Sequence, residues 1–274
     1  MLKKKWKSIF IISVACTVFN VAAHAMFAPV VKYDNPSFFT EHNIFGVTAA
    51  LFLFVMYVLL AIVFVYFQRN LLGTKIRKGL RYGISFGCLW FFSVLGMCLV
   101  ANSPLKAELL VGFFDFLTAI VLGLLLGKYI ASNNETINLV ENKRRSFLVI
   151  PTILIVYVLG RYIAYIYFGS ELPYETKFWL SILWTMGIGF SMGVAYYLLQ
   201  SGLRYYSSIK KSVIFGFVIL GINWIIFNLF TIILVKVPLI ELIILAVSDI
   251  LLSVFGIFFF EFIYAKLNFA TQNR

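Results

Sequence analysis

The chain has 274 residues, of which 62% are hydrophobic and only 12% are charged, and its mean hydropathy is +0.97. These values exclude an ordinary soluble domain and indicate an integral membrane protein that contacts the lipid bilayer. The formal net charge of +12 comes from short basic runs between apolar stretches, which indicates a surface facing anionic lipid and no nucleic-acid partner.

Eight apolar stretches follow one another, each with the roughly 20 residues that cross about 30 Å of hydrocarbon. The expected spans are residues 8–31, 44–67, 82–101, 109–131, 147–168, 178–199, 213–235 and 242–265. The loops between them are short and leave no room for a soluble domain. The sequence therefore predicts an all-α integral membrane protein with eight transmembrane helices.

The first span contains Ala23-His24-Ala25 after a basic start and an apolar core, which is the pattern of a cleaved export signal. The apolar run continues to position 31, however, and cleavage would leave the first half of the chain one helix short of the second. We therefore expect this span to be retained, with His24 inside the membrane.

Basic residues are unevenly divided between the two sides of the expected membrane. Eighteen of the 23 lysines and arginines fall on the side of the N-terminus, four fall in the opposite loops, and Arg161 lies within a span. Because basic residues concentrate in cytoplasmic loops, we expect both termini to be cytoplasmic, in a bacterial-type cell membrane. Acidic residues of the outer loops, Glu108 and Glu241 among them, outnumber the lysines there and predict a mildly acidic rim.

The second half of the chain repeats features of the first. A shift of 137 positions places His24 on Arg161, and a shift of 134 aligns the third and fourth spans with the seventh and eighth. Because each unit holds an even number of spans, we predict two tandem parallel four-helix repeats, residues 1–137 and 138–274. The pairs aligned by the second shift include Gly87 and Gly221, Trp90 and Trp224, Pro104 and Pro238, and Asp115 and Asp249.

Polar side chains within the spans gather about seven or eight residues from the expected outer ends. A charge in hydrocarbon costs roughly 2.5–3.5 kcal/mol on insertion scales, so these groups require partners or a cavity. Two tyrosines flank Arg161 by one helical turn on either side, which predicts cation–π contact. The predicted substrate-binding residues are His24, Asp115, Arg161, Asp249, Asn20, Asn228, Tyr157 and Tyr165.

Two interpretations of these residues stay open. In the first, a cavity open to the outside lies between the repeats and receives a cationic or titratable residue and a carboxylate from each. In the second, Arg161 and one aspartate form a buried ion pair that fixes helix register. In such a pair the two charges cancel. The other aspartate and His24 then share one proton, which would support proton coupling.

Gly189, Ser191 and Gly193 match the G-x-S-x-G pattern of serine hydrolases, but they lie within the sixth span, far from His24 and His42. We therefore predict no catalytic residues and no enzyme. The same glycines form a Gly-x-x-x-Gly motif, typical of close helix packing, with hinge flexibility as the alternative. Similar motifs occur at Gly79-Gly83-Gly87 and Gly123-Gly127.

Other chemistry is not indicated. His, Cys and acidic residues lack metal-ligand spacing, three cysteines within spans predict no disulfide, and no cofactor is expected. No phosphate-binding glycine loop with lysine occurs, so an ATP-driven motor would need a partner subunit; a homo-oligomer stays open.

The sequence thus predicts a multi-pass transporter or permease for a small polar or cationic solute, with proton-coupled secondary transport as the favoured mechanism. The alternative is a non-transporting membrane sensor, immunity or assembly protein that binds a peptide or a lipid headgroup in the same outward-facing pocket.

Overall fold

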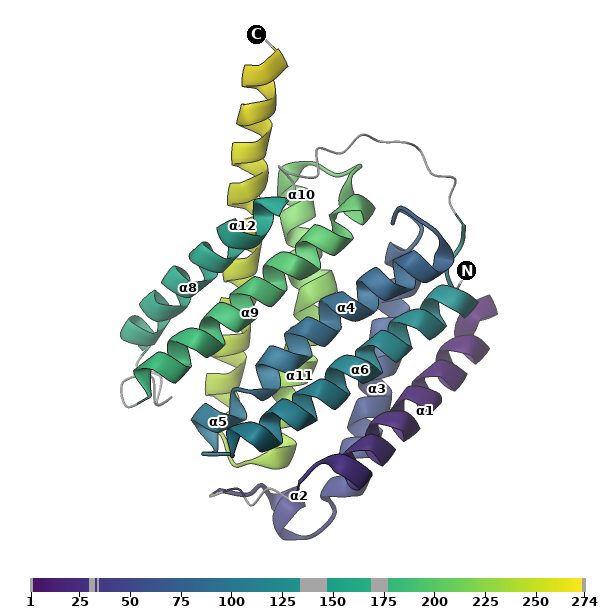
Figure 1. The fold of residues 1–274 in the computed structure, drawn as a ribbon, viewed down its shortest axis with the longest axis vertical. Coiled ribbons are helices and arrows are strands. Elements are labelled where there is room, and N and C mark those ends of the chain that lie inside the picture. Colours follow the sequence, from purple (N-terminus) through teal and green to yellow (C-terminus); the bar gives the residue numbers. More distant parts are fainter. Residues whose placement is uncertain (1, 30–32, 34, 134–146, 169–176, 273–274) are drawn as a thin grey trace.

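The computed structural model describes residues 2–29, 33, 35–133, 147–168 and 177–272, and these residues are all-α apart from one isolated β-bridge (Figure 1). The predicted repeat boundary at 137/138 lies outside the described residues. The elements are α1 (Leu2–Phe27), α2 (Phe38–Glu41), α3 (Phe45–Phe67), α4 (Lys75–Val94), α5 (Met97–Val100), α6 (Leu105–Tyr129), α8 (Val149–Phe168), α9 (Phe178–Leu199), the 3-10 helix η1 (Gln200–Leu203), α10 (Ser208–Val213), the π-helix η2 (Ile214–Leu220), α11 (Gly221–Leu234) and α12 (Leu239–Gln272).

Within the described part of the chain, eight helical segments are long and apolar enough to cross a membrane, as predicted. They are α1, α3, α4 with α5, α6, α8, α9 with η1, α10 through α11, and α12. The chain is therefore a multi-pass membrane protein by length and composition. Its two termini lie at the same end of the bundle (Figure 1), as an even number of crossings requires.

Several helix ends differ from the expected spans, those of α4 and α1 among them. The helix α4 begins at Lys75, seven residues before the expected span, because Lys78 is buried and its ammonium is satisfied. Its Nζ donates to the carbonyl oxygens of Gln68 at 3.0 Å and Ser132 at 2.9 Å. Conversely, α1 ends at Phe27, four residues before the expected end.

The helices pack in pairs within each half of the chain and across the halves. In the first half α1 contacts α3 and α6, and α4 contacts α6; in the second half α8 contacts α9 and α12, and α11 contacts α12. Three contacts join the halves: α4 with α9, α11 with α3 and α11 with α2. In Figure 1, α1, α3, α4 and α6 of the first half lie toward the right, and α8, α9 and α12 of the second half lie toward the left.

The Gly-x-x-x-Gly motifs lie in these helix contacts. A Cβ atom on Gly79 would lie 2.1 Å from the carbonyl oxygen of Gly123, so α4 and α6 approach closely only because both positions are glycine. A Cβ atom on Gly193 would lie 2.8 Å from the Cα atom of Ile150, so the G-x-S-x-G stretch packs α9 onto α8.

The outer faces of the spans are apolar. Val47, Leu51, Leu159 and Ile166 are each more than 60% exposed, and many other large aliphatic and aromatic residues share this surface. Exposed apolar area on this scale marks a hydrophobic environment. Hydrocarbon of the lipid bilayer provides that environment for an eight-span protein.

Candidate functional site

Arg161 lies in a closed polar cluster on α8. Its Nε donates to the hydroxyl of Tyr165 at 2.8 Å, and one terminal nitrogen donates to the hydroxyl of Tyr157 at 2.9 Å. The guanidinium also stacks over the rings of Tyr165 and Trp184, each 5.2 Å away. The predicted cation–π contacts are therefore present, and the side chain is almost fully buried.

Asp249 of α12 completes this cluster. Its Oδ1 forms an ion pair with Arg161 and accepts a hydrogen bond from Tyr157 at 3.0 Å, and its Oδ2 accepts one from the indole of Trp224 at 3.0 Å. The residue is only 1% exposed. A buried carboxylate with a fixed counter-charge and two further donors has its hydrogen-bonding capacity largely filled.

His24, Asn20 and Asp115 form a second cluster between α1 and α6. The side-chain amide of Asn20 donates to Oδ1 of Asp115 at 2.9 Å and to the hydroxyl of Thr118 at 3.2 Å. The Nε2 atom of His24 lies 3.5 Å from the same carboxylate oxygen. The side chains of His24 and Asp115 are 26% and 16% exposed, so this cluster is open where the other is closed.

These side chains do not all lie seven or eight residues from the ends of their helices, the distance expected from the sequence. His24 lies three residues from the end of α1, whereas Asp115 and Asp249 lie ten residues from the starts of α6 and α12. The side chains still meet, because the helix α1 ends early and its last turn packs beside the middle of α6.

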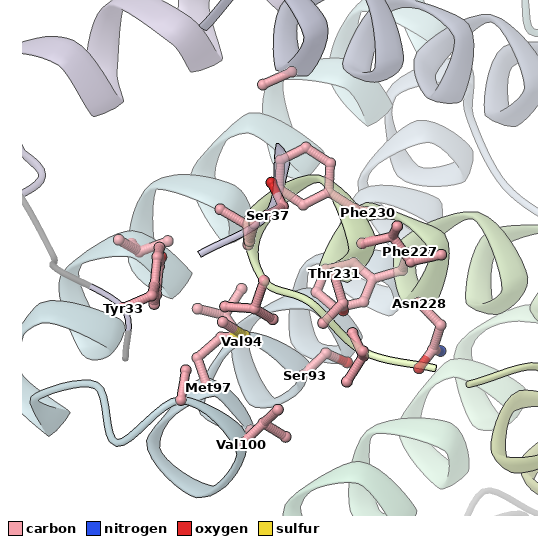
Figure 2. Close-up of a pocket in the computed structure, with 18 of the residues that line it drawn as sticks. Tyr33, Ser37, Ser93, Val94, Met97, Val100, Phe227, Asn228, Phe230 and Thr231 are labelled. Atoms are coloured by element: carbon pink, nitrogen blue, oxygen red, sulfur yellow. The ribbon is translucent and has the colours of Figure 1, made fainter. Parts of the chain in front are cut away.

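A cavity of about 1430 Å³ lies in the bundle, lined by residues from both halves (Figure 2). Five of the predicted site residues line it: Asn20, His24, Asp115, Arg161 and Asn228. Tyr157, Tyr165 and Asp249 do not, because they lie behind Arg161. The amide nitrogen of Asn228 donates to the carbonyl of Trp224 at 2.8 Å.

The sequence analysis missed several lining residues. Trp90, Trp184 and Trp224 line the cavity, as does Glu108, which is 2% exposed rather than part of a solvated rim. The sequence could have predicted Glu108 in the lining, because it precedes Asp115 by seven residues and so shares its helix face. The hydroxyl of Ser103 donates to Glu108.

Tyr33 adds a neutral hydroxyl to the lining, between α1 and α2. Burial raises the pKa of Tyr33 above its ordinary value, and the nearby carboxylate of Glu108 raises it further. The phenol therefore stays protonated throughout the physiological range and contributes no charge to the cavity.

The segment around α2 covers the end of the cavity that we predict to face outward. Pro36 and Val235 form an antiparallel β-bridge, and the amide of Lys236 donates to the carbonyl of Asn35 at 2.9 Å. The hydroxyl of Ser37 donates to the carbonyl of Ile233 at 2.5 Å. We call residues 35–41 the strap, since they tie the first half of the chain to the end of α11.

The cavity stops within the bundle. On α1, Asn20 and His24 line it, whereas Ser13 is fully buried and the hydroxyl of Thr17 donates to the carbonyl of Ser13 at 2.9 Å. At the opposite end of the bundle, Lys211 and Tyr196 both contact Glu261. The described residues thus form a pocket closed toward the helix ends that we predict to be cytoplasmic.

Within the described residues, no three His, Cys, Asp or Glu side chains are grouped so that they could hold a metal ion. Comparisons with protein-family models, with curated proteins and with solved structures find no match for this chain. The function is therefore inferred from the site itself.

Proposed function

We propose that the protein is a secondary transporter or permease that takes a small polar or cationic solute from outside the cell membrane, with both termini cytoplasmic. The carboxylate of Asp115 carries this proposal: it is partly exposed in the wall of a 1430 Å³ cavity, within a membrane-spanning bundle. A partly solvated carboxylate at this depth is costly unless it binds something.

The arrangement of helices supports two tandem parallel repeats. The largest helix contacts of the first half have counterparts after the shift: α1 with α3 matches α8 with α9, and α4 with α6 matches α11 with α12. The contact of α1 with α6 matches that of α8 with α12, and α4 with α9 matches α11 with α3. His24 and Asp115 then occupy the positions of Arg161 and Asp249, and the cavity lies between the repeats.

A single proton couples the site to pH in this proposal. The Nδ1 atom of His24 lies 2.9 Å from the carbonyl oxygen of Asn20, which can only accept, so Nδ1 carries a hydrogen. Nε2 therefore faces Oδ1 of Asp115. We assign the coupling proton to this contact: when a cation arrives beside Asp115, the proton leaves the pair for cavity water, and the net charge of the site is unchanged.

Two other titratable side chains interact with Asp115. Tyr57 lies on the adjoining helix α3, and Glu108 lies on α6 itself. Tyr57 is fully buried, whereas His24 and Asp115 are in contact in the cavity wall, so we assign the exchange of the proton to this pair.

A second candidate is a non-transporting sensor, immunity or assembly protein that binds a peptide or lipid headgroup. The closed inner half of the bundle favours it, because the described cavity has no continuation past Trp90 on α4 and Trp224 on α11. A transporter in its outward-facing or occluded state has the same closure. The two candidates are therefore separated by whether solute crosses the membrane.

Flux through purified protein in proteoliposomes, with and without a pH gradient, distinguishes them. We expect uptake of cationic solutes that rises when the vesicle interior is acidic, and at least a tenfold loss in the variant Asp115→Asn. A complete lack of flux across a broad panel of cationic and neutral polar solutes, in folded protein, would refute transport and favour the second candidate.

A further inference from the structure

The two cation–carboxylate pairs differ in one respect that points to the solute. Asp249 has a fixed counter-ion in Arg161, whereas no lysine or arginine nitrogen among the described residues lies within 4 Å of Asp115 or Glu108. Two carboxylates therefore line the cavity without a fixed cation. Resting on the proposed function, we propose that the solute is a hydrophobic organic cation whose positive group binds beside Asp115, as Arg161 binds beside Asp249.

The walls of the cavity suit an apolar body on that cation. Trp90, Trp184, Trp224, Phe227 and Phe230 line it, and ring faces attract cations and apolar groups alike. Ordinary small-molecule pockets have volumes of about 300–1000 Å³, so a cavity of 1430 Å³ accepts a bulky solute.

An inorganic cation fits the same walls less well. A dehydrated metal ion requires several oxygen ligands close together. Beside Asp115 the described side-chain oxygens are those of Asn20 and Thr118, and the hydroxyl of Thr118 already donates to the carbonyl of Phe114 at 2.8 Å. An organic cation needs only the charge and the ring faces.

Glu108 extends the site toward the strap. It lies seven residues before Asp115 on α6, roughly 10 Å along the helix axis, and it is buried in the cavity wall near the neutral phenol of Tyr33. Glu108 and Asp115 thus place two acidic groups along one face of α6 in the cavity wall. A cation that enters under the strap therefore meets Glu108 before it reaches Asp115.

Equilibrium dialysis of the full chain in lipid nanodiscs tests this substrate class. The probe is tetraphenylphosphonium, a permanent hydrophobic cation, and the neutral comparator is triphenylphosphine oxide; empty nanodiscs give the membrane background. We expect saturable binding of the cation at least tenfold tighter than that of the neutral compound. Asp115→Asn should weaken cation binding at least tenfold and Glu108→Gln about threefold to tenfold, with neutral binding unchanged.

Two further variants guard against a folding effect. Asp115→Glu keeps the charge and should retain binding within about threefold, and Glu261→Gln makes the same carboxylate-to-amide change away from the cavity and should leave binding unchanged. Equal binding of cation and neutral compound, or unchanged cation binding in Asp115→Asn, would overturn the proposal. Flux of polar solutes without phosphonium binding would overturn the substrate class and leave transport standing. Phosphonium binding without flux would support the ligand class and overturn transport.

Discussion

The Nε2 atom of His24 lies 3.5 Å from Oδ1 of Asp115 in the wall of the cavity. Arg161 and Asp249 make the corresponding contact in the second half of the chain, but there the pair is buried and joined by Tyr157 and Trp224. One pair is thus completed by fixed groups, and the other retains the capacity to exchange a proton or a cation. Substitutions in the two pairs should therefore have different effects, on stability in one and on binding in the other.

His24→Gln should weaken the pH dependence of cation binding. In the wild-type protein a proton held between His24 and Asp115 competes with the cation for the site, so affinity should fall as the pH is lowered. Glutamine keeps polarity but binds no proton, so affinity should change less with pH in the variant. His42→Gln is the matched control, since His42 is exposed on the strap side and does not line the cavity. An unchanged profile in His24→Gln would assign the proton elsewhere.

Arg161→Met should destabilise the protein rather than change its selectivity. It leaves the carboxylate of Asp249, which is 1% exposed, without its counter-ion. Breaking one partner of a buried pair typically costs about 3–5 kcal/mol. Chemical denaturation in mixed micelles measures this, and the double variant Arg161→Met/Asp249→Leu should recover much of the loss. Asp115→Asn should cost far less, because Asp115 is partly exposed and has no fixed cation. Equal losses for both single variants would contradict the distinction between the pairs.

Gly79→Ala should separate α4 from α6. Alanine is intrinsically better than glycine in a helix by about 1 kcal/mol, but its Cβ would lie 2.1 Å from the backbone oxygen of Gly123, which cannot move without shifting α6. Overpacking of this kind costs about 1–3 kcal/mol, so the net change should be destabilising. Gly46→Ala is the control, because nothing lies within 4 Å of a Cβ atom there and stability should stay equal or rise. Thermal unfolding in detergent compares the two variants. A higher unfolding midpoint for Gly79→Ala than for the wild-type protein would contradict the close contact between α4 and α6.

The sequence was sufficient for the helices, because each span is a separate apolar stretch whose length matches the bilayer. The partner of Arg161 was harder to predict. Asp115 and Asp249 occupy equivalent positions in the sequence, and the choice depends on α8 packing against α12. The contact of the strap with the end of α11 was not predicted. It consists of backbone hydrogen bonds such as that of Lys236 with Asn35, and of bonds from the hydroxyls of Ser37 and Thr40 to backbone carbonyls. Because a backbone group of any residue type can form such a bond, the sequence does not identify the partners.

The π-helix η2 in the seventh span was also not predicted, although Gly216 and Gly221 lie at its centre and just beyond its end. A Cβ atom on Gly216 would lie 2.2 Å from a methyl group of Val254 on α12. The wider π turn is a backbone adjustment to packing against that helix. Apolar periodicity alone does not distinguish such a turn from a regular α-helix.

A disulfide across the strap should close the cavity reversibly. Pro36 and Val235 face each other in an antiparallel bridge, where Cα atoms lie about 4.5–5.5 Å apart, within the range that a disulfide requires. The variant Pro36→Cys/Val235→Cys is made with Cys16, Cys88 and Cys98 replaced by alanine, since these are free thiols. Oxidation should lower uptake or phosphonium binding rates at least tenfold, reduction should restore them, and each single cysteine variant should be insensitive to both treatments. Solute exchange at the full rate in completely cross-linked protein would show that the solute reaches Asp115 by a route other than beneath the strap.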